Sequence, residues 1–326
     1  MNGMPKNFMP IFWAVATAMI LSYLIIRILI PVFMPHFGFN FAPKKIGNAA
    51  GGGDAGKVTI IEAPKLNANS NEAVTEESGS TAVQILPAVP RVVTASSYMI
   101  SDLISGRVVA QKDSERAVPI ASITKIVTAM VARTMMDQNE RIEMTGDILN
   151  TEGNSGGFRL GEKYRVSELL YPLLMVSSND AAEGLAAGYP YGRHQFIKAM
   201  NDWASSIGAY NTYFADPSGL SSANVSSAKD ISIIMRWIAT HEPDLLAIMH
   251  TKTKTIRIHT WTNPTMLLNM SAFQGGKNGY TSEAGQTGVS IFAADYTSVN
   301  SPAYVIVVLK SFDRNTDELL LLEKTK

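Results

Sequence analysis

The pattern of apolar and polar positions divides the chain into three parts. Residues 8–34 are apolar except for Arg27 and a few hydroxyl side chains, and a run of this length can cross a bilayer core of about 30 Å. Residues 44–91 are rich in Gly, Ala, Asn, Ser and Glu, so they bury too little apolar surface to offset their ordering entropy. The pattern therefore predicts a membrane anchor in residues 1–43, a flexible linker in residues 44–91 and a folded domain in residues 92–326.

The apolar run fits an uncleaved transmembrane helix better than a cleaved signal peptide. It is longer than the apolar region of a signal peptide, and Pro31, Pro35 and His36 stand where a cleavage site would have small residues. Arg27 lies towards one end, where its side chain can reach the interface. Basic residues occur on both sides of the run, so charge leaves the orientation of the span open.

Within the folded domain, the apolar spacing changes from strands to helices and back to strands. Residues 97–109 are predicted to form a hairpin around Ser105-Gly106. A helix is expected to begin near Ser122 and to carry an apolar stripe, and a last helix is expected in residues 316–323. This order predicts an α+β fold, with a helical subdomain against a mainly antiparallel sheet. The stripe comprises Ile126, Val127, Met130 and Val131; further helices are expected at 166–175, 180–187, 194–207 and 229–240, and strands at 253–259, 288–295 and 304–309.

Composition and charge exclude several kinds of function. The 326 residues include 28 basic and 28 acidic ones, which argues against a nucleic-acid partner, since no excess of Lys and Arg is left to pair with phosphates. The chain has no cysteine, so disulfides, a thiol nucleophile and Cys-ligated metals are excluded. Its five histidines are scattered, without a close metal-ligand spacing. We therefore expect neither a metal nor an organic cofactor.

Three short motifs carry the candidate chemistry, and each of them is common by chance. Ser-x-x-Lys occurs again at Ser226 and Lys229, where Ser227 and Asp230 instead indicate a helix N-cap. Ser-x-Asn and Lys-x-Gly also recur elsewhere in the chain. Only their context and order can therefore give them weight. The three motifs are Ser122-Ile123-Thr124-Lys125, Ser177-Ser178-Asn179 and Lys277-Asn278-Gly279.

The first motif has the spacing that a serine nucleophile and a lysine base require. Ser122 and Lys125 are three residues apart on a predicted helix and therefore share a face. Ser122 is expected in the first turn, where free N–H groups and the helix dipole favour a developing oxyanion. To take the Ser122 proton, Lys125 must be neutral, so its pKa must fall from about 10.4 towards 7–8. Burial and a second cation such as Lys277 would lower the pKa in this way.

The ordered trio resembles the motifs of penicillin-binding proteins and serine β-lactamases, and its flanks are closest to the D-alanyl-D-alanine carboxypeptidase family. The resemblance covers the chain from about Ser96 onward. It implies a serine D,D-carboxypeptidase that removes the terminal D-alanine of peptidoglycan stem peptides and binds β-lactam inhibitors. The expected localisation rests on a feature outside the resemblance: the N-terminal span would hold an extracytoplasmic domain at the cell membrane. The resembling segments are residues 116–125, 169–182, 214–220 and 275–285.

The resemblance also assigns a role to each motif residue. Ser122 would attack the peptide carbonyl with Lys125 as base, and Ser177 would relay a proton to the leaving amine. Asn179 would bind the substrate backbone, and Lys277 would supply positive charge near the substrate carboxylate. Gly279 would let the strand approach the ligand closely. The amides of Ser122 and Tyr280 would form the oxyanion hole, and Asn278 and Thr281 complete the substrate-binding segment of the third motif.

One departure from the family pattern leaves alternatives open. Asn278 stands where the family usually has Thr, whose hydroxyl helps to bind the substrate carboxylate. An Asn amide can also donate a hydrogen bond, so altered affinity is expected rather than lost chemistry. The alternatives are a D,D-endopeptidase, a β-lactamase, and a catalytically weak protein that binds peptidoglycan stems. For the β-lactamase no added deacylating Glu stands out, although Glu162 lies in a plausible interval.

Other conspicuous residues are expected to be structural. The segment Gly153-Asn154-Ser155-Gly156-Gly157 fits Gly-x-Ser-x-Gly, but no strand precedes it and no helix follows it, so we predict a loop at the rim of the site. Asp180 and Glu183 are expected to open a helix rather than to form a catalytic pair. The tryptophans Trp203, Trp237 and Trp261 are expected in the core or at the rim.

Overall fold

The computed structural model describes residues 92–153, 155–295 and 301–325. The predicted anchor and linker in residues 1–91 lie outside the described residues. In the part that is described, none of the helices combines the length and the apolar character needed to cross a membrane.

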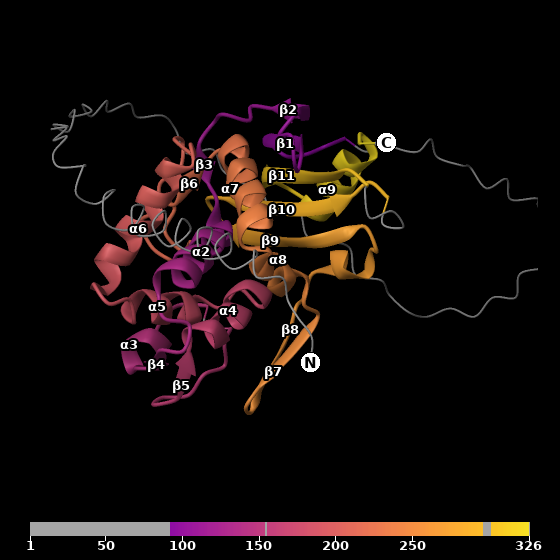
Figure 1. Ribbon diagram of the computed structural model, residues 1–326. Helices are drawn as coiled ribbons and strands as arrows, with labels where there is room; N and C mark the ends of the chain where they lie inside the picture. The colour runs from indigo at the N-terminus through magenta and orange to yellow at the C-terminus, as the bar shows by residue number, and fades with distance from the viewer. Residues whose placement is uncertain (1–91, 154, 296–300, 326) are drawn as a thin grey trace, which may run out of the picture. The chain divides into compact units, whose positions relative to one another are not determined.

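A five-stranded sheet forms one half of the folded part, in the order β2-β1-β11-β10-β9. Every neighbouring pair in it is antiparallel, so the predicted mainly antiparallel sheet is confirmed. The first strands of the domain join the last ones because β1 pairs with β11 along its whole length (Figure 1). The strands are β1 (Ser97–Asp102), β2 (Val108–Lys112), β9 (Phe273–Thr281), β10 (Gly285–Ala293) and β11 (Ala303–Ser311).

Side chains alternate along the strands and enter two separate cores, one on each side of the sheet. Val305 and Val307 belong to the larger core, which they share with α7 (Ala228–His241) and α8 (Pro243–His250). Ile306 and Val308 belong to the smaller core, which α9 (Arg314–Glu323) closes with Leu321. The strands are therefore apolar on both faces, which explains the uninterrupted apolar run in β11.

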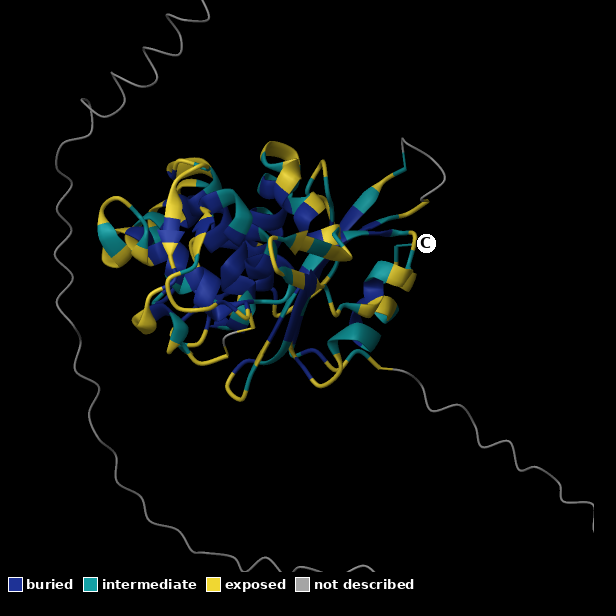
Figure 2. Ribbon diagram, turned by 90° about the horizontal axis from the view of Figure 1, so that it is seen from below, coloured by how far each residue is buried: buried dark blue, intermediate teal, exposed yellow. Residues whose placement is uncertain are grey.

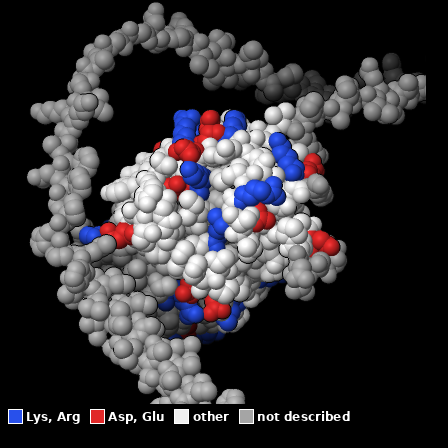
Figure 3. All heavy atoms as spheres, turned by 45° about the horizontal axis from the view of Figure 1, so that its top comes forward, with Lys and Arg blue, Asp and Glu red and all other residues white. Residues whose placement is uncertain are grey.

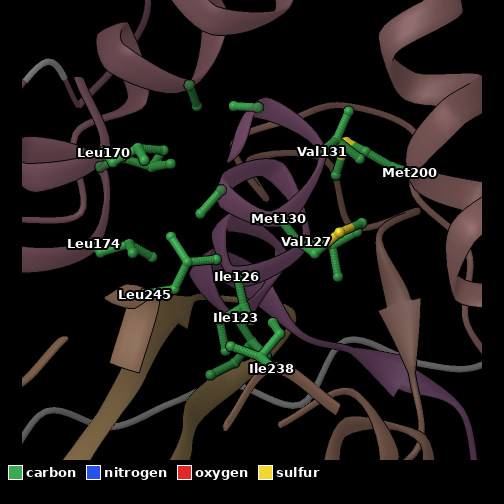
Figure 4. Packing of buried hydrophobic residues seen from close by; sticks show 14 of the residues in the cluster. Ile123, Ile126, Val127, Met130, Val131, Leu170, Leu174, Met200, Ile238 and Leu245 are labelled. Atoms are coloured by element: carbon green, nitrogen blue, oxygen red, sulfur yellow. The ribbon is translucent and has the colours of Figure 1, made fainter. Parts of the chain in front are cut away.

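The helical subdomain is built around α2 (Lys125–Met135), which follows the 3₁₀ turn η1 (Ala121–Thr124). The predicted apolar stripe of α2 is buried among side chains of its neighbours, including Leu170 of α4, Met200 of α6 and Ile238 of α7 (Figure 4). Figure 2 shows the buried residues gathered inside this helical part and along the central strands. The helices around α2 are α3 (Gly146–Leu149), α4 (Val166–Met175), α5 (Asn179–Ala187) and α6 (Gly192–Ser206).

Three two-stranded ribbons and a second 3₁₀ turn connect these parts. The ribbon β7–β8 stands away from the sheet (Figure 1). A strand was expected over residues 253–259, but β7 ends at Ile256 because the chain turns at Arg257, whose φ is 53°. The remaining elements are β3 (Val118–Pro119) with β6 (Val225–Ser226), β4 (Arg141–Glu143) with β5 (Lys163–Arg165), β7 (Thr253–Ile256) with β8 (His259–Thr262), and η2 (Met266–Asn269).

Candidate active site

The first motif brings its two functional side chains into direct contact. The Lys125 ammonium donates a hydrogen bond to Ser122 Oγ at 2.9 Å. Ser122 lies in the 3₁₀ turn η1 that precedes α2, which refines the expectation that it lies in the first turn of the α-helix. The side chain of Lys125 is fully buried, whereas Ser122 is partly exposed. The hydroxyl is therefore open to a ligand while the amine beneath it is shielded from water.

Burial lowers the pKa of Lys125 to about 7. A charged amine loses its hydration when it is buried, so the neutral form is favoured. The carboxylates of Asp216, Asp180 and Glu183 act in the opposite direction and raise the pKa again. The sequence predicted both burial and the charge of Lys277 as causes of the lowered pKa. Burial is confirmed as the cause, whereas the charge coupling of the two lysines acts on the pKa of Lys277 instead.

A loop that sequence reasoning named only as a family segment holds Lys125 in place. The carbonyl of Ser218 accepts a hydrogen bond from the Lys125 ammonium. Asp216 fixes this loop, because its carboxylate accepts hydrogen bonds from the amides of Ser218, Gly219 and Ser221 at 2.6–2.7 Å. Burial would raise the pKa of Asp216, but these hydrogen bonds outweigh it and lower the pKa.

The backbone around Ser122 leaves no room for a side chain at two glycines. A Cβ on Gly279 would lie 2.7 Å from the amide nitrogen of Ser122, and a Cβ on Gly219 would lie 2.0 Å from the carbonyl oxygen of Ala121. Ala121 itself has a φ of 49°, a conformation that costs a non-glycine residue about 1–3 kcal/mol. Strand β9 was predicted to allow a close approach at Gly279, and in the structure it lies close to the backbone of the nucleophile itself.

The second and third motifs meet through another lysine and serine. The Lys277 ammonium donates hydrogen bonds to Ser177 Oγ at 3.0 Å and to the carbonyl of Asn278 at 2.7 Å. Ser177 has a φ of 60°, which places it in the left-handed region. Strain of this kind is typical of functional sites. Two residues that are far apart in the sequence thus form a second serine–lysine pair.

The two serine–lysine pairs belong to one electrostatic unit. Burial lowers the pKa of Lys277 well below its ordinary value, and the charges of Lys125 and Arg314 lower it further. Two buried amines that are close together cannot both remain protonated without cost. The site is therefore arranged to hold fewer protons than two surface lysines would.

Asn179 lies at the start of α5 and contacts the glycine-rich loop predicted at the rim. Its amide nitrogen donates a hydrogen bond to the carbonyl of Glu152 at 2.8 Å. A Cβ on Gly153 would lie 2.7 Å from the same amide nitrogen, so a glycine lets the loop approach Asn179. The loop has no regular secondary structure at its described residues, in agreement with the prediction.

The other residues of the third motif lie at the end of β9. Asn278 is half-buried and is paired with Gly288 of β10. The side chain of Tyr280 is exposed. The pairing of β9 with β10 therefore fixes the position of its backbone but not that of its side chain. The hydroxyl of Thr281 accepts a hydrogen bond from the amide of Ala284 at 3.1 Å and holds the β9–β10 turn.

Arg314 is a residue of this site that the motifs did not reveal. It is the first residue of α9, and its guanidinium donates a hydrogen bond to the carbonyl of Gly279 at 3.4 Å. Its charge reaches Lys277, as the lowered pKa of that lysine indicates. The sequence predicted the last helix only as a packed element. Nothing in the sequence therefore marked an arginine at its start as a residue of the site.

Glu162 and the other conspicuous side chains have structural partners. The Glu162 carboxylate accepts a hydrogen bond from Tyr164 at 3.0 Å and pairs with His259 at 3.0 Å, so it is committed to the contact between the loop and ribbon β7–β8. Ser227 caps α7 by accepting a hydrogen bond from the amide of Asp230, as predicted. Asp180 lies in the first turn of α5. Trp203 and Trp261 are buried and Trp237 is partly buried, also as predicted.

The sequence matches the family model of D-alanyl-D-alanine carboxypeptidases over residues 84–310. It is 33% identical over 234 residues to a D-alanyl-D-alanine endopeptidase of Pseudomonas aeruginosa, covering 68% of this chain and 73% of that one. A D-alanyl-D-alanine endopeptidase of Escherichia coli is 32% identical over 238 residues, covering 69% and 74% of the two chains.

The fold has solved relatives as well. The structure of a D-alanyl-D-alanine carboxypeptidase from Mycobacterium tuberculosis superposes with a TM-score of 0.66 at 28% sequence identity, over 74% of this chain and 95% of that one. The structure of an ampicillin-bound penicillin-binding protein D2 from Listeria monocytogenes has the same fold, with a TM-score of 0.63 at 22% identity, over 72% and 98% of the two chains.

On the face shown in Figure 3, basic side chains lie among acidic ones, in keeping with the formal charge of zero. Motifs, site geometry and family match agree, and the chain belongs to the D-alanyl-D-alanine carboxypeptidase family.

Proposed function

We propose that Ser122, Lys125 and Ser177 hydrolyse the terminal D-alanyl-D-alanine bond of peptidoglycan stem peptides, the activity for which the family is named. The observation that carries these roles is the arrangement of two half-open serine hydroxyls, each hydrogen-bonded to a buried lysine. No other pair of described residues combines a serine, a lysine of lowered pKa and an opening to solvent in this way.

Acylation begins with the neutral amine of Lys125. It takes the proton of Ser122 Oγ as that oxygen bonds to the carbonyl carbon of the scissile peptide. Negative charge then develops on the carbonyl oxygen, and the amides of Ser122 and Tyr280 stabilise it there. The close packing of Gly279 on the Ser122 amide supports this assignment, since it brings the backbone of β9 beside the nucleophile.

The leaving D-alanine needs a proton on its nitrogen when the C–N bond breaks. Ser177 relays to it the proton that Lys125 took from Ser122, so Lys125 is neutral again, and Lys277 holds the Ser177 hydroxyl in place through their hydrogen bond at 3.0 Å. The free carboxylate of the substrate lies against the positive charge of Lys277 and Arg314. Water then attacks the ester on Ser122 as neutral Lys125 takes one of its protons; the C–O bond to Ser122 breaks, Lys125 returns that proton to Ser122 Oγ, and the shortened stem peptide leaves with the oxygen of the water in its new carboxyl group.

The same site binds β-lactams covalently in this proposal, because a penicillin offers an amide carbonyl and a carboxylate in similar positions. A solved relative carries ampicillin. A β-lactamase would require rapid deacylation, and the partners that hold Glu162 leave that carboxylate poorly suited to activate water.

A cross-linked peptide is the second candidate substrate. The two relatives of 33% and 32% identity are named endopeptidases, and cleavage of a cross-link breaks the same kind of D-alanyl bond. The two activities are separated by incubating the protein with purified cross-linked dimers and with uncross-linked pentapeptide monomers. Release of D-alanine alone supports the carboxypeptidase, whereas conversion of dimers to monomers supports the endopeptidase.

The nucleophile is tested with a fluorescent penicillin. The parent protein is expected to be labelled covalently, and Ser122→Ala is expected to lose the label. Ser226→Ala is the matched control, because Ser226 also precedes a lysine by three residues but hydrogen-bonds to Thr212 instead. Labelling of Ser122→Ala would contradict the proposal by showing that another residue is the nucleophile. No labelling of a folded parent would contradict it as well and would favour a protein that only binds stem peptides.

Tethering of the domain to the cell membrane by residues 1–43 is part of the proposal. The apolar run of residues 8–34 supports it. Deletion of residues 1–43 is expected to move penicillin-labelled protein from the membrane fraction to the soluble fraction, and labelled protein that stays with membranes after the deletion would refute the anchor.

A further inference from the structure

Glu318 is a buried carboxyl to which the proposed reaction gives no role. Glu318 of α9 is 2% exposed. Its Oε2 accepts a hydrogen bond from Ser290 Oγ of β10 at 2.8 Å. Its Oε1 lies against Gly288, where an added Cβ would come within 2.1 Å of it. The sheet thus has a bare position that accommodates this carboxyl.

The position of Glu318 is directly behind the third motif. The carboxyl of Glu318 packs against Gly288, which has no side chain. Gly288 is the strand partner of Asn278. A small cavity has Asn278, Ser290, Arg314 and Glu318 in its wall, together with residues at the end of α4. The departure from the family pattern at Asn278 and the buried carboxyl therefore lie in one place.

Arg314 connects Glu318 to the substrate side of β9. It precedes Glu318 by one helical turn, and its Cδ would lie 3.4 Å from a Cβ on Gly288. Its guanidinium reaches the carbonyl of Gly279, while its buried Nε has no hydrogen-bond partner among the described residues. The charge of Glu318 raises the pKa of Arg314 against the effect of burial. Each charge is therefore felt by the other.

We propose that Glu318 is a positioning residue that sets, through Arg314, the positive charge that the end of β9 presents to a substrate carboxylate. This inference rests on the proposed function. When Glu318 is neutral, the charge of Arg314 acts fully on the carboxylate; when Glu318 is ionised, it offsets part of that charge. By linkage, substrate affinity falls as Glu318 loses its proton, and a bound carboxylate makes that proton harder to lose.

The surroundings of Glu318 place this titration near neutral pH. Burial raises the pKa of Glu318 to about 7, and the neighbouring charge of Asp317 also raises it. The hydrogen bond from Ser290 and the charge of Arg314 lower it. Two further charged groups act at this point: Asp313, at the start of α9, raises the pKa of Arg314, and the buried Lys277 of β9 has its own pKa lowered by the charge of Arg314.

The test follows KM and kcat for a stem peptide with a free carboxylate across the pH range around 7. The KM of the parent is expected to rise about threefold to tenfold as pH increases through the pKa of Glu318. In Glu318→Gln, KM is expected to stay lower than in the parent and to rise less with pH, only by the part that Lys277 contributes, while the kcat profile, which Lys125 governs, stays the same. With a peptide ending in a carboxamide, the pH dependence of KM is expected to disappear in both proteins.

Two further variants make the result decisive. Ser290→Ala removes a hydrogen bond that lowers the pKa of Glu318, so the rise in KM is expected to move to higher pH. Glu323→Gln is the matched control, because Glu323 is an exposed residue of the same helix, and its KM profile is expected to match the parent. An identical pH dependence of KM in the parent and in folded Glu318→Gln would overturn the inference and leave Glu318 a purely structural residue.

Penicillin labelling separates this inference from the function on which it rests. A parent that is not labelled counts against the proposed function itself. A parent that is labelled, but whose KM is independent of pH around 7, overturns only the role of Glu318.

Discussion

At the scale of single residues, the site depends on what happens to two lysines when they are buried. Lys125 and Lys277 are both removed from water, and the serines they contact remain half-open. A buried amine is more easily deprotonated than one on the surface, which turns an ordinary lysine into a base at neutral pH. The backbone has left-handed φ values at Ala121, next to the first serine, and at Ser177 itself. The surrounding fold therefore sustains both an unfavourable charge state and an unfavourable conformation.

The lowered pKa of Lys125 predicts how acylation depends on pH. Only the neutral amine can accept the Ser122 proton, and the neutral fraction grows as pH rises through a pKa of about 7. The second-order rate of penicillin labelling is therefore expected to increase roughly tenfold per pH unit below this value and to level off above it. Stopped-flow fluorescence at a series of pH values measures this rate. A rate that did not change with pH in a folded protein would show that Lys125 is not the base.

The contact between Gly279 and the nucleophile predicts a large effect of one methyl group. In Gly279→Ala the new Cβ would meet the amide of Ser122 and the hydroxyl of Thr287, each at 2.7 Å. We expect penicillin labelling to slow by at least about tenfold, because a small misplacement of a nucleophile is costly. Gly146→Ala is the control, since a Cβ there meets nothing within 4 Å, and it should be labelled at the parent rate. Equal labelling rates for both variants would argue against this packing.

At the scale of elements, the site is assembled from the ends of helices, one edge of the sheet and a loop. The turn η1 supplies the nucleophile, the start of α5 supplies Asn179, and β9 brings Lys277 and Gly279. The loop centred on Asp216 is the least regular of these parts. Its carboxylate replaces the hydrogen bonds that a regular element would give to the loop amides, and the loop in turn offers a carbonyl to Lys125.

This arrangement predicts the effect of Asp216→Asn on stability. The carboxylate offers two charged acceptor oxygens to the loop amides, whereas the Asn side chain offers one neutral acceptor oxygen. We therefore expect a loss of about 1–3 kcal/mol in the free energy of unfolding at pH 7. Because the pKa of Asp216 is lowered on folding, its stabilisation is present above the unfolded pKa of about 4 and is lost as pH falls further. Urea unfolding should therefore show the two proteins converging in acid.

The control for this prediction is Asp137→Asn. Asp137 is an exposed residue whose carboxylate accepts a hydrogen bond from the amide of Asn139 at 3.0 Å, so the change should stay within about 0.5 kcal/mol. If Asp216→Asn were no more destabilising than Asp137→Asn, the loop would have to be held by other contacts.

At the scale of the whole folded part, the sheet joins the beginning and the end of the domain. Strand β1 pairs with β11, and the amide and hydroxyl of Thr94 donate hydrogen bonds to Asp317 of α9 at 2.7 and 2.8 Å. The helical subdomain lies between these segments in the sequence. Its larger core is continuous with one face of the sheet, so neither half has a complete core without the other.

This closure predicts which fragments fold. A fragment of residues 92–326 is expected to unfold in one cooperative transition and to be labelled by penicillin at the rate of the full chain. A fragment that begins at residue 103 lacks β1 and Thr94, and it is expected to be unfolded because β11 loses a neighbour. Circular dichroism and penicillin labelling distinguish the two cases. A folded, labelled shorter fragment would show that β1 is dispensable.

The sequence by itself determined the local parts of this protein. Apolar spacing predicted the bounds of α4 and the buried stripe of α2. A helix has 3.6 residues per turn, so residues three or four positions apart share a face and the pattern can be recognised from nearby positions alone. The i, i+3 spacing of Ser122 and Lys125 predicted their contact for the same reason. Pattern did not predict α8 or β8, which are short elements of eight and four residues; their conformation depends on the surfaces against which they pack.

Only the tertiary structure decided how the distant parts act together. The pKa of Lys125 depends on complete burial, and the pairing of Ser177 with Lys277 joins segments from the helical subdomain and the sheet. Arg314 hydrogen-bonds to the third motif at the carbonyl of Gly279, and Glu318 lies against Gly288 on the neighbouring strand β10. Desolvation, charge coupling and close packing act through space between residues that are remote in sequence. These quantities therefore exist only once the chain has folded.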